Sequence, residues 1–167
     1  MLQFRFEAQP GIPQFSRAFS RFGDAVEDFT EAFEQIADDF YEGEEHMFSS
    51  GGSGAGGWAP LAASTVARKG SSEILVETGI LEDSLTSRSG AFSRFDLRPK
   101  RLEMGTQVPY GIYHQTGTSR MPARPPVKLA EDQKSQWVQI LHAHIVAAWR
   151  GEKAAGAVPL SSWPKEF

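Results

Sequence analysis

The chain has 167 residues, of which 40% are hydrophobic and 23% are charged, a balance typical of a soluble globular protein of one domain. It contains no cysteine, so disulfides and thiolate metal sites are excluded. The first residues lack a signal-peptide pattern, and no stretch approaches the roughly 20 apolar residues of a membrane span. We therefore expect a protein made in the cytoplasm with no membrane partner.

The net charge of −4 is unevenly distributed along the chain. Residues 1–50 carry eleven acidic and three basic side chains, whereas the remaining 117 residues carry ten acidic and fourteen basic ones. Such a chain can pair its charges internally or join head to tail with copies of itself. Its bulk charge does not predict a nucleic-acid-binding protein.

The first fifty residues predict a strand followed by a long helix. Apolar and polar residues alternate over residues 2–8, which is the period of a half-buried strand. Apolar residues then recur at spacings of four and three, which predicts a helix from about Pro13 to Glu42 lying across a sheet, or alternatively an intermolecular coiled coil. The apolar positions are Phe15, Phe19, Phe22, Val26, Phe29, Phe33, Ile36 and Phe40. An acidic strip occupies the polar face and consists of Glu27, Glu31, Glu34 and Asp38.

A glycine-rich segment, residues 49–57, separates this helix from the next predicted element. Its composition predicts a mobile loop or a segment that is ordered by a neighbour, and it lacks the Lys-Ser/Thr pair of a phosphate-binding loop. A second helix should begin with Pro60 as its first residue and end at Lys69, because Gly70 follows as a helix stop.

Residues 78–106 predict a short helix and then a hairpin. Thr78 is a suitable N-cap for a helix that continues through Leu85. The hairpin spans residues 91–106 with its turn at Pro99 and Lys100. This is the basic part of the chain, and it offers either a solvated rim or a surface that faces a ring of subunits or an acidic partner. Its basic residues are Arg88, Arg94, Arg98, Lys100 and Arg101.

The segment from Pro109 to Pro126, PYGIYHQTGTSRMPARPP, combines aromatic residues with rigid turns. Pro109 suits the first position of a short helix, which would place Tyr110, Tyr113 and His114 on one face. Gly117 is predicted to end that helix with a left-handed backbone. The proline-rich run after it must be an extended connector. Aromatic residues beside rigid loops favour contact with another surface.

A final helix is predicted from about Lys128 to Arg150, with an apolar stripe that includes Trp137 and Trp149. We therefore expect a single domain over residues 1–150, followed by a tail over residues 151–167. Trp163 in that tail favours docking onto a neighbouring surface.

The residues give little support to an enzyme. His114 is the one histidine in an informative setting, but no serine, threonine or carboxylate can be assigned to it as a partner, which favours a hydrogen-bonded structural histidine. Glu44, Glu45 and His46 are expected to form a solvated helix end. We expect no catalytic residues, no metal and no cofactor.

Two blocks of residues resemble the phage virion morphogenesis family, the tail-completion or head–tail joining proteins of Mu-like and related tailed phages. The first block reads W-x-P-L-x-x-S-T-x-x-x-K, then T-G-x-L-x-x-S, over residues 58–84. The second reads M-G-T-x-V-x-Y-x-x-x-H-Q-x-G and then M-P-A-R-P, over residues 104–125. The glycine-rich loop and Pro126 depart from the family pattern, which affects the local path of both loops.

The resemblance implies a small α+β subunit, with an antiparallel sheet packed by a long N-terminal helix and a C-terminal helix. It further implies a ring, expected to contain six copies, in the neck of the virion between the head-completion or stopper protein and the tail terminator or tail tube. DNA would pass through the lumen without being read. The alternatives are a tail-tube terminator ring or a hydrolase-type accessory enzyme that uses His114.

These expectations divide the motif residues into two groups. Contact with other subunits or partners is expected from Trp58, Leu61, Lys69, Arg94, Arg98, Arg101, Tyr110, Tyr113, His114, Gln115, Arg120, Arg124 and Trp163. A structural part is expected for Pro60, Thr65, Thr78, Gly79, Leu81, Gly117, Pro122 and Pro125.

Overall fold

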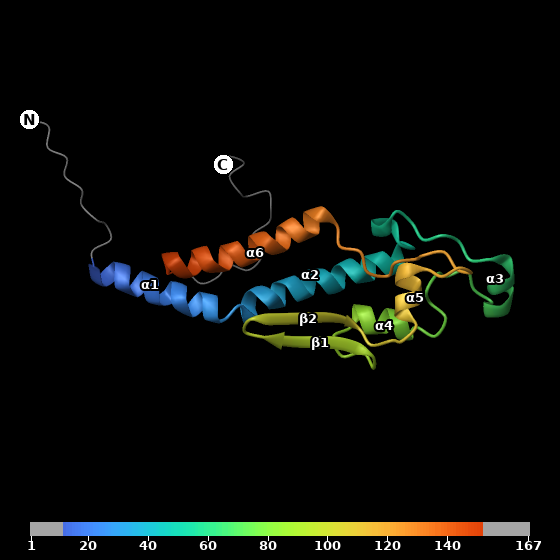
Figure 1. Ribbon diagram of the computed structural model, residues 1–167, viewed down its shortest axis with the longest axis horizontal. Helices are drawn as coiled ribbons and strands as arrows, with labels where there is room; N and C mark the ends of the chain where they lie inside the picture. The colour runs from blue at the N-terminus through green and yellow to red at the C-terminus, as the bar shows by residue number, and fades with distance from the viewer. Residues whose placement is uncertain (1–11, 152–167) are drawn as a thin grey trace, which may run out of the picture.

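A computed structural model describes residues 12–151 and shows an α+β fold, as the sequence predicts. The expected strand over residues 2–8 and the tail with Trp163 lie outside the described residues. In Figure 1 helix α1 forms one end of an elongated molecule and α3 forms the other. The elements are α1 (Ile12–Glu27), α2 (Thr30–Ser49), the 3-10 turn η1 (Ser53–Ala55), α3 (Ala63–Lys69), α4 (Ile80–Thr86), β1 (Ser93–Arg98), β2 (Arg101–Thr106), α5 (Gly111–Thr116) and α6 (Glu131–Arg150).

The long helix predicted from Pro13 to Glu42 is two helices, because the chain breaks between α1 and α2. At the break the main-chain N–H of Phe29 donates to the carbonyl of Pro99 in the hairpin turn, at 2.7 Å. The N–H of Thr30 donates to the Asp28 carboxylate at 2.9 Å and so gains a partner at the start of α2. The apolar spacing continues through this break, so periodicity alone could not reveal it.

The core forms where α2 packs against α4 and the hairpin, with α6 lying along α1 and α2 (Figure 1). Burial is uneven along the predicted apolar stripe of the first helices. Ile36 and Phe40 are buried, whereas Phe15 and Phe19 near the start of α1 are exposed. The buried core residues are Phe40, Tyr41, Met47, Phe48, Trp58, Leu81, Leu85 and Val108.

The predicted hairpin is confirmed. Strands β1 and β2 are antiparallel, and their register pairs Phe95 with Met104 and Arg98 with Arg101 across the turn at Pro99 and Lys100. Phe95 and Met104 both pack against the core. These two strands make up the sheet of the described residues.

Three short helices begin later than predicted. Pro60 precedes α3, whose N-cap is Ala62, because the carbonyls of Ala59 and Pro60 are bound by another segment. Gly79 rather than Thr78 is the N-cap of α4, with a left-handed φ of 75°.

Pro109 likewise lies before the Tyr110 N-cap of α5. Gly117 ends α5 with a positive φ of 71°, as predicted, but its ψ of 178° lies outside the left-handed helical region. The start of α6 is three residues later than expected, since its N-cap is Ala130.

The glycine-rich segment closes onto Trp58. Gly52 has a φ of 84°, and a Cβ at this position would lie 2.5 Å from the indole ring, so both the backbone and the packing require glycine. The N–H of Trp58 donates to the carbonyl of Gly51 at 2.9 Å. The mobility expected of residues 49–57 stays a prediction.

Glu44 departs from the expected solvated helix end. It is only 3% exposed and faces the core from α2, while its neighbours Glu45 and His46 are exposed. The sequence predicted that Glu44 would be exposed to solvent, because it stands next to Glu45 and His46 in a run of three polar residues. In the folded chain α2 presents Tyr41, Glu44 and Phe48 on one buried face.

Candidate functional site

The two sequence blocks meet in space and hold each other. The indole Nε1 of Trp58 donates to the main-chain carbonyl of Pro125 at 2.9 Å. The guanidinium of Arg124 donates to the carbonyls of Ala59 and Pro60, at 2.6 and 2.9 Å. Trp58 and Arg124 are both at most 6% exposed, so they join segments of one chain and are not free for a partner.

A second joint connects T-G-x-L-x-x-S with M-G-T. The hydroxyl groups of Ser84 and Thr106 lie 2.7 Å apart, and Ser84 also donates to the carbonyl of Leu81 at 2.8 Å. Thr106 in turn accepts the N–H of Val108 at 3.0 Å. Ser84 and Leu81 are buried, so these motif positions fix how α4 packs on β2.

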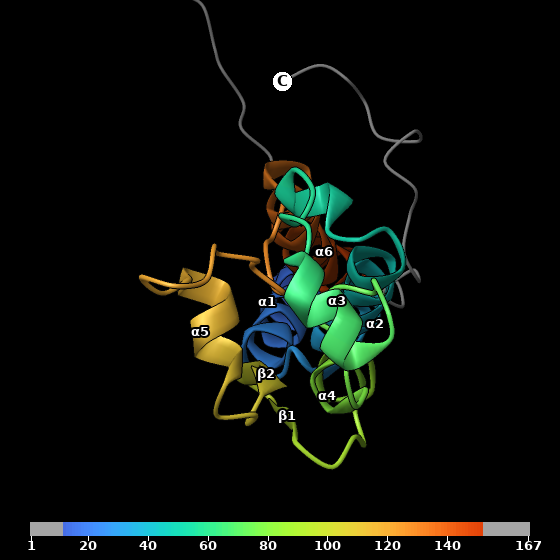
Figure 2. The same cartoon turned by 90° about the vertical axis from the view of Figure 1, so that its right-hand side faces the viewer.

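The outer face of α5 is the largest group of exposed apolar side chains near the motifs. Tyr110, Ile112 and Tyr113 are 42%, 57% and 56% exposed. Figure 2 shows α5 at the side of the molecule, away from α4. We call these three residues the α5 face.

The structure holds the α5 face in place from behind. Gly111 is buried, and a Cβ there would contact Thr106 and Leu81 at 3.4–3.5 Å. The Gln115 side chain donates to the carbonyl of Val127 at 2.9 Å and accepts its N–H at 3.3 Å. A Cβ at Gly117 would lie 2.7 Å from the backbone N of Ala123. An exposed aromatic group on so constrained a helix can contact a partner with little loss of conformational entropy.

His114 turns back from this face. Its ring packs edge-on against Tyr110, with 6.0 Å between the centroids, and its carbonyl accepts the N–H of Arg124 at 2.8 Å. Burial, and secondarily the nearby Arg124 charge, lower the pKa of His114. Its buried Nδ1 has no hydrogen-bond partner among residues 12–151, so the expected hydrogen-bonded histidine is here a packing residue.

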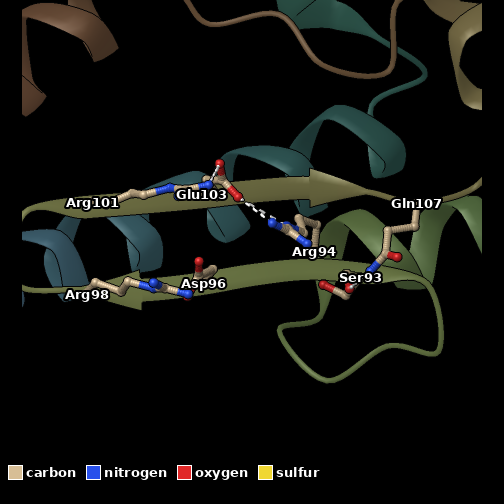
Figure 3. Close-up of polar contacts among 7 residues, drawn as sticks. All are labelled: Ser93, Arg94, Asp96, Arg98, Arg101, Glu103 and Gln107. Atoms are coloured by element: carbon tan, nitrogen blue, oxygen red, sulfur yellow. Dashed lines mark hydrogen bonds and ion pairs between the residues drawn. The ribbon is translucent and has the colours of Figure 1, made fainter.

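The basic hairpin is partly neutralised by its own acids. Figure 3 shows Glu103 between Arg94 and Arg101, and Arg98 beside Asp96. The Arg94–Glu103 and Arg98–Asp96 pairs have N–O distances of 2.6 and 3.1 Å. The Arg94 and Arg101 hydrogen bonds lower the pKa of Glu103. These arginines stay exposed, but they offer much less free positive charge than the sequence suggests.

Three of the four carboxylates of the acidic strip are also paired within the chain. Arg88 bridges Glu34 and Asp38 at 2.6 and 2.7 Å, and Lys100 in the hairpin turn binds Glu27. The guanidinium carbon of Arg88 lies 5.0 Å from the ring centroid of Phe95, in a cation–π contact. The sequence places Arg88 among the basic residues around the hairpin, but no periodicity or motif marks it as the bridge between Glu34 and Asp38. An acidic strip already paired in this way is a weak candidate for the contact between subunits.

The remaining motif residues are placed at the α3 end and in the proline-rich connector. Leu61 and Thr65 are half-buried, and Lys69 donates to the carbonyl of Glu73. Arg120 and Pro122 are exposed beside the isolated bridge between Thr118 and Met121. Arg120 and Pro122 thus lie in the connector that follows α5.

The described part of the chain shows no arrangement for metal binding and no helix long and apolar enough to cross a membrane. Glu44 is its most perturbed carboxyl, because burial raises the pKa to about 8. The Oε2 atom of Glu44 is buried and has no hydrogen-bond partner within residues 12–151. An uncharged carboxyl inside a packed core affects stability and is not placed to act on a substrate.

A search of family models matches residues 12–145 to the phage virion morphogenesis family. This range covers most of the chain and contains both sequence blocks and the α5 face. The chain therefore belongs to the phage virion morphogenesis family, as its motifs predict. No curated protein and no solved structure matches it. Membership defines a bacteriophage structural or assembly protein.

Proposed function

We propose that this protein is a ring-forming tail-completion or head–tail joining subunit in the neck of a tailed phage virion. The α5 face carries this proposal, because a family of virion proteins works through contacts between subunits. Six copies would surround a lumen through which DNA passes, between the head-completion or stopper protein and the tail terminator or tail tube. Trp58 and Arg124 would act indirectly, by fixing the connector that holds α5.

Closed rings of identical subunits use heterologous interfaces, in which two different surfaces of one chain meet. The α5 face supplies one such surface, with rigid aromatic side chains of the kind that dominate interface energetics. The pairs within the hairpin and the acidic strip leave apolar contact as the main driving force. Ring formation should therefore be only weakly sensitive to salt.

Electron microscopy tests this proposal at two levels. Purified protein should form rings, and particles made without it should be filled heads separated from complete tails. Detached tails of irregular length would instead indicate a tail terminator. A uniformly monomeric protein, together with normal virions in its absence, would contradict a structural role in the neck.

A further inference from the structure

A contiguous aromatic patch lies at the end of the α1–α6 helix pair. Phe15, Phe19 and Trp149 are 50%, 61% and 41% exposed. Trp149 contacts Phe15 and Phe22 edge-on, with centroids 6.2 and 6.4 Å apart, and Phe15 stacks on Phe19 at 6.1 Å. Single exposed apolar residues are ordinary, but a contiguous group of large rings marks a contact surface. We call Phe15, Phe19, Phe22 and Trp149 the arm patch.

The chain leaves α6 directly beside the arm patch. Gly151 caps α6 with a left-handed φ of 74°, which turns the backbone away from the helix axis. A Cβ at Gly151 would lie 3.1 Å from the guanidinium carbon of Arg21 on α1. Arg21 also donates to the carbonyls of Ala148 and Trp149, at 3.0 and 3.3 Å. Gly151 therefore lies against α1, within one helical turn of Trp149 in the patch.

The segment after Gly151 has the length and composition to cover the patch. Residues 152–167 contain Leu160, Trp163 and Phe167. The extended reach from Gly151 to Trp163 is about 40 Å, whereas Phe15 and Arg21 are only about 9 Å apart along α1. A short tether gives its own chain an effective concentration on the order of millimolar at the patch, ahead of any second copy.

We propose that residues 152–167 fold back on their own chain and cover the arm patch, with Trp163 as the main anchor. The family match ends at residue 145, so residues 152–167 lie outside the matched range. The proposed contact therefore does not depend on the proposed function in the neck.

Engineered cysteines test the contact cleanly, because the chain has none of its own. Ser16 is exposed on α1 between Phe15 and Phe19, and Ser162 adjoins Trp163. We expect the full-length pair Ser16→Cys with Ser162→Cys to form an intrachain disulfide at least tenfold faster than Ser72→Cys with Ser162→Cys. Ser72 is the matched control because it is exposed and lies three residues after α3, the helix at the other end of the molecule from α1 (Figure 1). Equal rates for the two pairs would overturn the proposal.

Two further experiments distinguish residues 152–167 from the other segments that could cover the arm patch. Mixing a Ser16→Cys chain with a Ser162→Cys chain should give little interchain disulfide, and a dominant interchain product would assign the contact to a second copy. The full-length variant Leu160→Glu with Trp163→Glu should bind several-fold more of the apolar dye ANS, whereas Phe4→Glu with Phe6→Glu should not. The reverse pattern would show that residues 1–11 cover the patch and that the proposal is wrong.

Discussion

The indole nitrogen of Trp58 and the main-chain carbonyl of Pro125, 67 residues apart in the sequence, are joined by a hydrogen bond of 2.9 Å. Arg124 strengthens the same joint through the carbonyls of Ala59 and Pro60. The most recognisable motif residues are therefore tertiary connections. These residues hold the loops around α5 in place. A partner can reach the exposed tyrosines of the α5 face, Tyr110 and Tyr113.

Arg124→Ala should destabilise the fold strongly. It would remove two hydrogen bonds from a charged donor, to the carbonyls of Ala59 and Pro60, and such bonds contribute about 1.5–3 kcal/mol each. We expect the free energy of unfolding to fall by about 2–4 kcal/mol in urea denaturation. Arg120→Ala is the matched control, because Arg120 is exposed in the same connector and should change stability by less than about 0.5 kcal/mol. Equal losses for the two variants would contradict the clamp.

Glu44 should make the folded protein less stable as the pH rises. Its pKa is raised from 4.5 to about 8, so the folded chain holds a proton that the unfolded chain releases between these values. The contribution of Glu44 to the free energy of unfolding should therefore be largest below pH 4.5 and fall by up to about 1.4 kcal/mol per pH unit as the pH rises toward 8.

Comparison of variants isolates this effect from other titrating groups. Glu44→Met preserves the side-chain volume and removes the proton, so its stability advantage over the native chain should grow between pH 5 and pH 8. Glu45→Gln, on the exposed side of α2, should leave the difference from the native chain nearly constant. Thermal melts at several pH values measure both. A constant gap for Glu44→Met would show that Glu44 is solvated.

The α5 face should control assembly without controlling folding. Tyr113→Glu places a charge on a side chain that is 56% exposed in the subunit, so the melting temperature should change little while ring formation is lost. Val138→Glu is the control, because Val138 is 65% exposed on α6, away from this face. Size-exclusion chromatography and electron microscopy would distinguish them. If Tyr113→Glu still formed normal rings, the α5 face would not be part of the interface between subunits.

Arg88→Ala should weaken the contact between α2 and the hairpin. Arg88 combines two carboxylate partners with contacts over the Tyr41 and Phe95 rings, so we expect a loss of about 1–2 kcal/mol in urea denaturation. Arg98→Ala removes one exposed ion pair and should cost less than about 1 kcal/mol. A loss from Arg98→Ala as large as that from Arg88→Ala would mean that the bridge adds nothing beyond a surface pair.

The sequence by itself determined the fold class, the hairpin with its turn at Pro99 and Lys100, the helix stops at Gly70 and Gly117, and the family. These features depend on local chemistry: alternation sets a strand, and only glycine adopts a positive φ without strain. The exposure of Tyr110 and Tyr113 was also predicted, since aromatic residues stand there beside rigid turns.

Only the tertiary structure decided which polar and aromatic residues are buried and how the charges pair. Trp58, Arg124 and Glu44 look like surface residues in the sequence, and their partners or neighbours come from segments that the linear pattern cannot connect. The break at Phe29 has the same cause, because the N–H that leaves the helix is bound by Pro99 in the hairpin, seventy residues further along the chain. Periodicity reports one element at a time, whereas burial and pairing depend on where the elements meet.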